Sequence, residues 1–226
     1  MEQNTLAQLS KNGNTYNPQC AAFLALPPKV QARATALAQR YGSRFLDVCA
    51  CFPSMNKGTV VASLEDAVGM QAPTLIMVDK TWGEGASVYW LEVQLAEVMM
   101  FLGIRDKLTP YQRNALAKLL RQEAYERSIT LAEMMIFFSR FENGYYKTFQ
   151  GYERPNPQVV TKSFAMFKDD LMEMRCDMAE REDNIRKRKE REEEGMKSCH
   201  GVPQASMDLY KKLVEDYNSK HHNINK

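Results

Sequence analysis

Apolar residues recur every three or four positions along most of the chain, which is the spacing of one face of an α-helix. The pattern is clearest in residues 84–102, where the apolar positions are Val88, Leu91, Leu95 and Val98. Residues 44–52 fit a short buried helix and a strand about equally well. The pattern therefore predicts an all-α fold built around a compact multi-helix domain. It leaves one segment open between helix and strand.

Two helices with the same kind of start are predicted between residues 108 and 149. Thr109-Pro110-Tyr111-Gln112 and Thr130-Leu131-Ala132-Glu133 both match the capping box. In this motif the threonine oxygen accepts from the backbone N–H three residues on, and the Gln or Glu side chain reaches back to the threonine N–H. The helices should span residues 110–126 and 131–142, and Asn143-Gly144 is a typical helix end. We expect the two helices to form a helical hairpin.

Other helix boundaries are marked by proline, glycine and small polar residues. A helix is predicted from Pro27-Pro28 to Gly42, because proline fits the first helical turn and glycine often follows the last. Ser63 and Thr74 mark the starts of shorter helices. Asn156-Pro157 begins the longest one, which should continue to Glu194 and would then span about 57 Å.

The far end of this long helix changes from an apolar stripe to a run of charges. Arg186, Lys187, Arg188 and Lys189 are followed by a glutamate-rich stretch, and Gly195 should end the helix. The segment has to project from the domain or pack on a partner, so these four residues are candidate partner-binding residues. The alternative is a solvated surface whose charges pair four positions apart. The predicted division is an N-terminal helical extension (1–61), a helical core domain (62–183) and a charged helix end with a polar tail (184–226).

Composition and charge narrow the classes of function. Hydrophobic residues make up 44% and charged residues 26%, which is typical of a globular protein. The net charge of +2 gives no global field toward nucleic acid or an anionic membrane, so such binding would need a local patch. The N-terminus lacks the pattern of a signal peptide, and no apolar run is long enough for a membrane span. We expect a cytoplasmic protein without membrane attachment, and without disulfides among its five scattered cysteines.

Motifs for catalysis, cofactors and metals are not found in the sequence. There is no phosphate-binding loop, dinucleotide fingerprint, nucleophile elbow or zinc-protease motif. The three histidines lie in the polar tail, away from any expected cleft. Cys199-His200 and His221-His222 are adjacent pairs, whereas zinc ligands usually stand two to five residues apart. We expect no cofactor and no metal, and an enzyme is unsupported.

The most distinctive candidate site is the loop after residue 142. Aromatic and basic residues alternate there, a combination that can stack exposed bases and neutralise phosphates. The alternative is that Tyr145, Phe149 and Tyr152 fold inward and fill the junction between two helices. The candidate nucleic-acid-binding residues are Arg140, Tyr145, Tyr146, Lys147, Phe149 and Arg154.

Residues 89–175 also carry a resemblance to a known family. The motifs are Trp90-Leu91-Glu92-Val93-Gln94-Leu95, Lys107-Leu108-Thr109-Pro110-Tyr111-Gln112, Leu131-Ala132-Glu133 with Phe137-Phe138, Asn143-Gly144-Tyr145-Tyr146 and Phe167. The block resembles an uncharacterised helical family common in Bacteroidetes and in their phages and mobile elements. Members often have Gly after the Gly-Tyr pair, where this chain has Tyr146-Lys147. The family has no agreed activity, so the resemblance implies a cellular context and no mechanism.

Two functions follow as expectations. The first is a non-enzymatic accessory or adaptor protein in DNA replication or related DNA transactions of a mobile element or phage. It would contact single-stranded or junction DNA through the aromatic–basic loop and a protein partner through the long helix. The alternative is a protein-binding or virion-structural component whose long helix associates with its own copy as a homo-oligomer.

Overall fold

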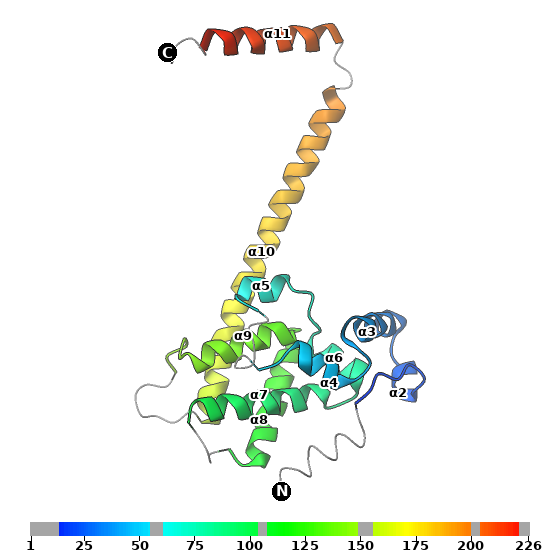
Figure 1. The fold of residues 1–226 in the computed structure, drawn as a ribbon, viewed down its shortest axis with the longest axis vertical. Coiled ribbons are helices and arrows are strands. Elements are labelled where there is room, and N and C mark those ends of the chain that lie inside the picture. Colours follow the sequence, from blue (N-terminus) through cyan, green and yellow to red (C-terminus); the bar gives the residue numbers. More distant parts are fainter. Residues whose placement is uncertain (1–13, 55–60, 104–107, 149–155, 200–203, 222–226) are drawn as a thin grey trace. The chain divides into compact units, whose positions relative to one another are not determined.

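A computed structural model of the chain describes residues 14–54, 61–103, 108–148, 156–199 and 204–221. Within these residues the fold is all-helical, and β-pairing is limited to two isolated bridges, Thr15 with Arg44 and Thr74 with Thr130. The chain divides into two compact units, Met1–Arg175 and Cys176–Lys226. The helices (Figure 1) are α2 (Ala21–Leu24), α3 (Pro28–Tyr41), α4 (Phe45–Cys51), α5 (Leu64–Gly69), α6 (Leu75–Trp82), α7 (Ala86–Phe101), α8 (Pro110–Glu126), α9 (Leu131–Glu142), α10 (Pro157–Cys199) and α11 (Gln204–His221).

Both predicted capping boxes are present, and α8 and α9 begin and end where the sequence placed them. The Thr109 hydroxyl accepts from the Gln112 N–H at 3.2 Å, and the Thr109 N–H donates to the Gln112 side chain at 2.9 Å. The same pair of bonds joins Thr130 and Glu133, at 3.2 and 2.7 Å. Each box provides acceptors for two backbone N–H groups that have no hydrogen-bond partner within the helix. This local chemistry explains why the two boundaries were predictable.

The helical hairpin of the first unit differs from the expected one. α8 lies mainly along α7, whereas α9 packs against α5 and α7. The reason is that α7 is apolar nearly all round, with buried residues such as Val88, Trp90 and Leu95 on different sides. A helix of this kind takes the centre of a core, so both of its successors pack against it.

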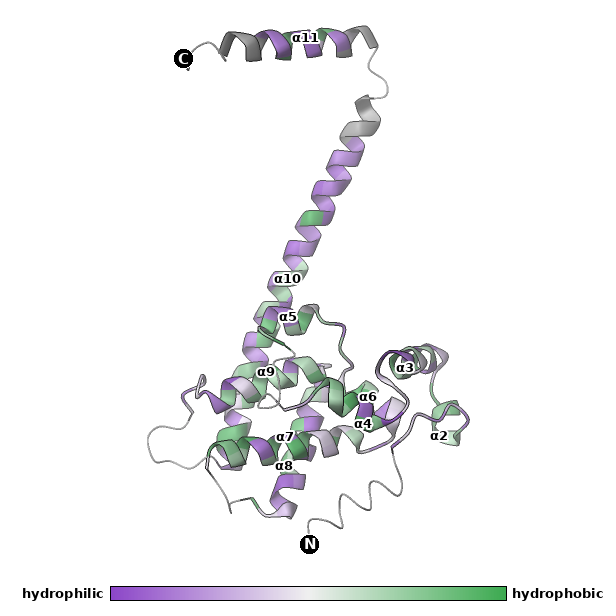
Figure 2. Cartoon of the chain, in the orientation of Figure 1, coloured by the Kyte–Doolittle hydropathy of each residue, from purple (hydrophilic) through white to green (hydrophobic). Residues whose placement is uncertain are grey.

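Phenylalanine rings join α9 to the first part of α10. The Phe137 ring lies 4.9 Å from that of Phe164 and 5.5 Å from that of Phe167, measured between centroids. All three rings are fully buried. Figure 2 shows the apolar residues concentrated on α7 and α9. This cluster fixes the side of α10 that faces the core, and with it the path of the chain after α9.

Residues 44–52, which the sequence left undecided between helix and strand, contain the helix α4. This helix belongs to the main core. Phe45 and Val48 are buried there, and the Phe52 carbonyl accepts from the Trp90 indole N–H at 2.9 Å. The Trp82 indole N–H donates to the Gly42 carbonyl at 3.1 Å. The end of residues 1–61 therefore shares the main core with the residues that follow, whereas Phe23 of α2 and Ala34 of α3 form a second, smaller apolar cluster with Met77 of α6.

α10 contributes Pro157–Arg175 to the first unit and its remaining residues to the second. The division after Arg175 lies before the predicted boundary at residue 183. Beyond Leu171 none of the described side chains of α10 is buried. The helix also continues through Gly195, which was expected to end it; one glycine costs a helix only about 1 kcal/mol. No helix in the described ranges is both long and apolar enough to cross a membrane.

Candidate functional site

The predicted aromatic–basic loop begins with a sharp turn after α9. We call Arg140, Tyr145, Tyr146 and Lys147 the tyrosine corner. Gly144 has φ 67° and Lys147 has φ 51°, so the backbone passes twice through the left-handed region. Glycine adopts this conformation without strain, and here it lets the Tyr145 N–H return to the Arg140 carbonyl at 2.9 Å. The two neighbouring rings meet edge to face, with centroids 5.1 Å apart, but they differ in burial: Tyr145 is 57% exposed and Tyr146 only 5%.

The guanidinium of Arg140 lies over the ring of Tyr145. The Arg140 Cζ lies 4.6 Å from the Tyr145 centroid, within cation–π range. The same guanidinium donates to the Asp170 carboxylate on α10 at 2.8 Å. Arg140 is therefore held in place by two neighbours, and its charge is largely neutralised by Asp170. Lys147 is exposed and brings a further positive charge to the corner.

Tyr146 is a core residue, which corrects its assignment to the nucleic-acid-binding set. Its ring lies 6.4 Å from that of Phe137 and belongs to the main apolar cluster. Burial raises the pKa of Tyr146 to about 12, against an opposing effect of Arg140. A ring in this position cannot stack on a base. Phe149, Tyr152 and Arg154 lie outside the described residues.

The four basic residues expected to bind a partner lie on the exposed part of α10 in the second unit. Lys187 pairs with Asp183 at 2.6 Å, and Arg188 pairs with Glu192 at 2.9 Å. Arg186 pairs with Asp183 as well, and Lys187 is the main reason why the pKa of that carboxyl lies below its ordinary value. This is the pattern of a helix surface whose charges pair with each other. Lys189 is exposed on the same stretch.

A buried polar cluster between α6, α7 and α8 was not anticipated from the sequence. The Asp79 carboxylate accepts from the Ser87 N–H and from the Ser87 hydroxyl, both at 2.8 Å. It also pairs with the Arg121 Nε at 2.8 Å and accepts from the Tyr125 hydroxyl. α7 begins after Gly85, which has no side chain to cap the helix. Asp79 therefore caps α7 from a neighbouring helix.

This cluster borders a cavity of about 430 Å³, in which the segment around Thr15 and Asn17 forms another wall. Both carboxylate oxygens of Asp79 are engaged by donors, which leaves little capacity for it to act as a base. Burial, with a second contribution from Asp79, raises the pKa of Tyr125 to about 12. The arrangement is that of a structural network which stabilises the junction of three helices. Its members lie far apart in the sequence, so no motif marks it.

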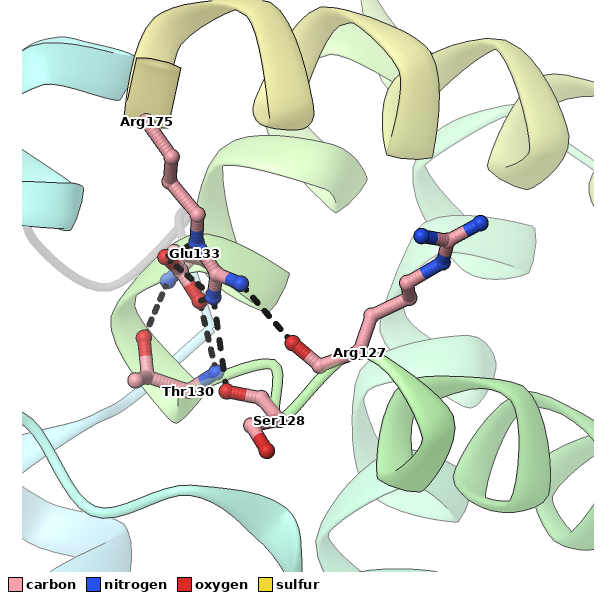
Figure 3. Close-up of polar contacts among 5 residues, drawn as sticks. All are labelled: Arg127, Ser128, Thr130, Glu133 and Arg175. Carbon is pink, nitrogen blue, oxygen red and sulfur yellow. Dashed lines mark hydrogen bonds and ion pairs between the residues drawn. The ribbon is translucent and has the colours of Figure 1, made fainter.

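A second buried carboxylate, Glu133, connects α9 to α10 (Figure 3). Arg175 donates to both oxygens of Glu133, with two of these distances at 2.8 Å, and also to the carbonyls of Arg127 and Ser128 at 2.8 and 3.3 Å. Glu133 meanwhile keeps its capping bond to Thr130. One arginine thus holds the α8–α9 connection against the last residues of α10 that belong to the first unit.

Neither a metal-binding cluster among the described residues nor a related protein points to a function for these sites. Among the side chains that the structure describes, no group of three His, Cys, Asp or Glu is placed to hold a metal ion. The side chains of the four candidate ligands in the tail, Cys199, His200, His221 and His222, are outside the described set. Comparisons of the chain with known protein families, curated proteins and solved structures give no match.

Proposed function

We propose that the protein is a non-enzymatic adaptor that acts in the cytoplasm in DNA replication or related DNA transactions of a mobile element or phage. It contacts single-stranded or junction DNA at the tyrosine corner. The observation that carries the proposal is the exposed Tyr145 ring with the Arg140 guanidinium 4.6 Å from its centroid. Tyr146, being buried, has no part in the contact.

The chemistry of the corner suits an unpaired base. Stacking of a base on an aromatic ring contributes about 1–3 kcal/mol and tolerates any sequence. Asp170 keeps Arg140 against one side of the Tyr145 ring, so the platform exists before the ligand arrives and costs little ordering entropy. Lys147 can neutralise a phosphate next to the stacked base.

Two further observations support an adaptor in this setting. The buried carboxylates Asp79 and Glu133 both have structural partners, which favours binding over catalysis. The family resemblance of residues 89–175 suggests the mobile-element context. An adaptor also needs a surface for a second macromolecule, and α10 offers a long exposed helix in the second unit.

Fluorescence anisotropy with a labelled oligothymidine tests the proposal. Wild-type protein should bind, and Tyr145→Ala should weaken binding about tenfold, as expected for the loss of one stacked base. Tyr111→Ala is the matched control, because Tyr111 is 83% exposed at the start of α8. Absence of binding by the wild type, or equal losses in the two variants, would overturn the assignment of the tyrosine corner.

A second candidate function is a protein-binding or virion-structural component that associates with its own copy. It is favoured by α11, where Leu209, Tyr210, Leu213 and Val214 are exposed and spaced to form one helix face. Light scattering of the full chain tests this. A dimer or larger oligomer that dissociates on Leu213→Glu supports self-association, and a monomer at all concentrations contradicts it.

A further inference from the structure

The first unit contains a groove of about 640 Å³ beside the start of α9, whereas the tyrosine corner follows the end of that helix. It lies between α3, the connection from α5 to α6, and the start of α9, where Thr130 and Glu133 contribute to the wall. We call it the α3 groove. The lining residues that matter for binding are Arg33, Ala36, Leu37, Arg40, Val68 and Met70.

The rim of the α3 groove is positively charged. The one acid in its lining, Glu133, is paired with Arg175, so these two charges cancel. Arg33 and Arg40 remain, both exposed and seven residues apart on α3, which is about 10.5 Å along the helix axis. Arg40 donates to the neutral Gln71 carbonyl at 3.3 Å. Among the described residues none forms an ion pair with Arg33.

The sequence around α3 strengthens this field. α3 itself contains Lys29, Arg33 and Arg40 and no Asp or Glu. The remainder of the chain is nearly balanced or slightly acidic, since the whole carries only +2. The local basic patch that the net charge conceals therefore lies on α3. An anionic partner would be attracted there even though the protein as a whole has little field.

We propose that the α3 groove binds an acidic segment of a partner protein that also carries aliphatic side chains. The floor is aliphatic, with Leu37, Val68 and Met70 among its residues, and its lining contains no aromatic ring. Such a floor suits leucine-like side chains better than bases, which prefer to stack on rings. The carboxylates of the segment pair with Arg33 and Arg40, whose planar guanidinium groups can donate to both oxygens of a carboxylate at once.

This inference goes beyond DNA contact and does not depend on it. The groove adjoins the start of α9, whereas Tyr145 follows its end, so the two surfaces use different residues. Together they would give one unit a place for a protein and a place for a nucleic acid. Either surface can fail its test without affecting the other.

The test uses the full chain and a fluorescein-labelled amphipathic peptide of leucine and glutamate, with leucines at helical spacing. Binding is measured by anisotropy at low and moderate salt. The wild type should bind, and the Arg33→Glu/Arg40→Glu variant should lose at least about tenfold in affinity. The same peptide with lysine in place of glutamate should not bind. Absence of binding by the glutamate peptide overturns the proposal.

Two matched controls separate the groove from general effects. Lys118→Glu/Lys162→Glu makes the same change in net charge at exposed positions on α8 and α10 and should retain binding. Ala36→Trp fills the groove and should abolish binding, whereas Ala165→Trp, at an exposed position on α10, should not. Equal losses in the two charge variants, or unchanged binding by Ala36→Trp, contradict the proposal. Competition by oligothymidine that is lost with Arg33→Glu/Arg40→Glu would assign the groove to nucleic acid instead.

Discussion

Removal of the Arg175 guanidinium should lower the free energy of unfolding of the first unit, because it leaves the Glu133 carboxylate buried without its counter-charge. The Glu133 side chain is 2% exposed and that of Arg175 is 26% exposed. Breaking a fully buried ion pair by removing one partner costs about 3–5 kcal/mol. Water reaches the arginine side of this pair, so we expect about 2–3 kcal/mol for Arg175→Met, which keeps an aliphatic side chain along α9.

Glu133→Gln removes the negative charge but keeps the helix cap, so it separates the contribution of the ion pair from that of the capping box. Glutamine can still accept from the Thr130 N–H, as Gln112 does for Thr109, so the capping box should survive. The loss should be about 1–2 kcal/mol, because Arg175 can turn to solvent. In the double variant no unpaired charge remains. The two changes should therefore be non-additive by about 1–2 kcal/mol.

Urea unfolding of the four proteins, followed by circular dichroism, measures this coupling. A loss of 2–3 kcal/mol in a unit of this size corresponds to roughly 4–12 °C in the melting temperature. The exposed pair Arg188–Glu192 provides the control cycle, with an expected coupling below about 0.5 kcal/mol. If the Glu133–Arg175 coupling is no larger than that of the control, the pair does not hold α10 to the α8–α9 connection.

Three further predictions concern the buried polar groups. Tyr125 and Tyr146 have pKa values raised to about 12, so the folded state holds their protons more tightly than the unfolded state, whose tyrosines titrate near 10. Stability should be complete below about pH 10 and decline as the pH rises toward 12, and Tyr146→Phe should reduce this decline in alkaline unfolding curves. Burial raises the pKa of Cys49 to about 12, so a thiol reagent near neutral pH should modify the exposed Cys51 and leave Cys49 unmodified until the protein unfolds; equal rates would contradict this. Asp79→Ala should lower the free energy of unfolding by about 3 kcal/mol, since it leaves Arg121 without its ion pair and α7 without its cap, and a melting temperature equal to that of the wild type would show that the network contributes nothing.

Local chemistry made parts of the fold predictable from the sequence. The two capping boxes fixed the starts of α8 and α9, and Ser63, Thr74 and Asn156 accept from the N–H three residues on, as expected of helix caps. Such motifs act within one turn of helix and need no knowledge of the rest of the chain. The helix boundaries were therefore largely correct, apart from the continuation of α10 through Gly195.

Contacts between distant residues could not be predicted in this way. Asp79 and Arg121 belong to different helices, and nothing in their local sequence marks them as partners. The same holds for Glu133 and Arg175, although Glu133 was correctly expected to act in a cap. The pairing of α8 with α7 followed from the burial of α7 on all sides, which a single apolar stripe does not reveal.

The candidate site shows the same limit at the level of two adjacent rings. The sequence placed Tyr145 and Tyr146 in one aromatic–basic loop, and it left open whether the rings of this loop stack on bases or fold inward. In the turn that contains the left-handed residues Gly144 and Lys147, the Tyr145 ring is exposed and the adjoining Tyr146 ring is buried. The burial of each ring depends on a backbone conformation that the residue types alone do not determine. The net charge of +2 conceals the basic surface on α3, because it does not show that three positive charges lie on this one helix without an acidic residue among them.

The most direct test of the adaptor account is photochemical cross-linking of the full chain to a single-stranded oligonucleotide that contains 5-iodouracil, with the modified peptide identified by mass spectrometry. The account predicts a cross-link at Tyr145, its loss in Tyr145→Ala and its persistence in Tyr111→Ala. Cross-links confined to other parts of the chain, or no cross-link above that seen with excess unlabelled competitor, would contradict the claim that the tyrosine corner receives DNA.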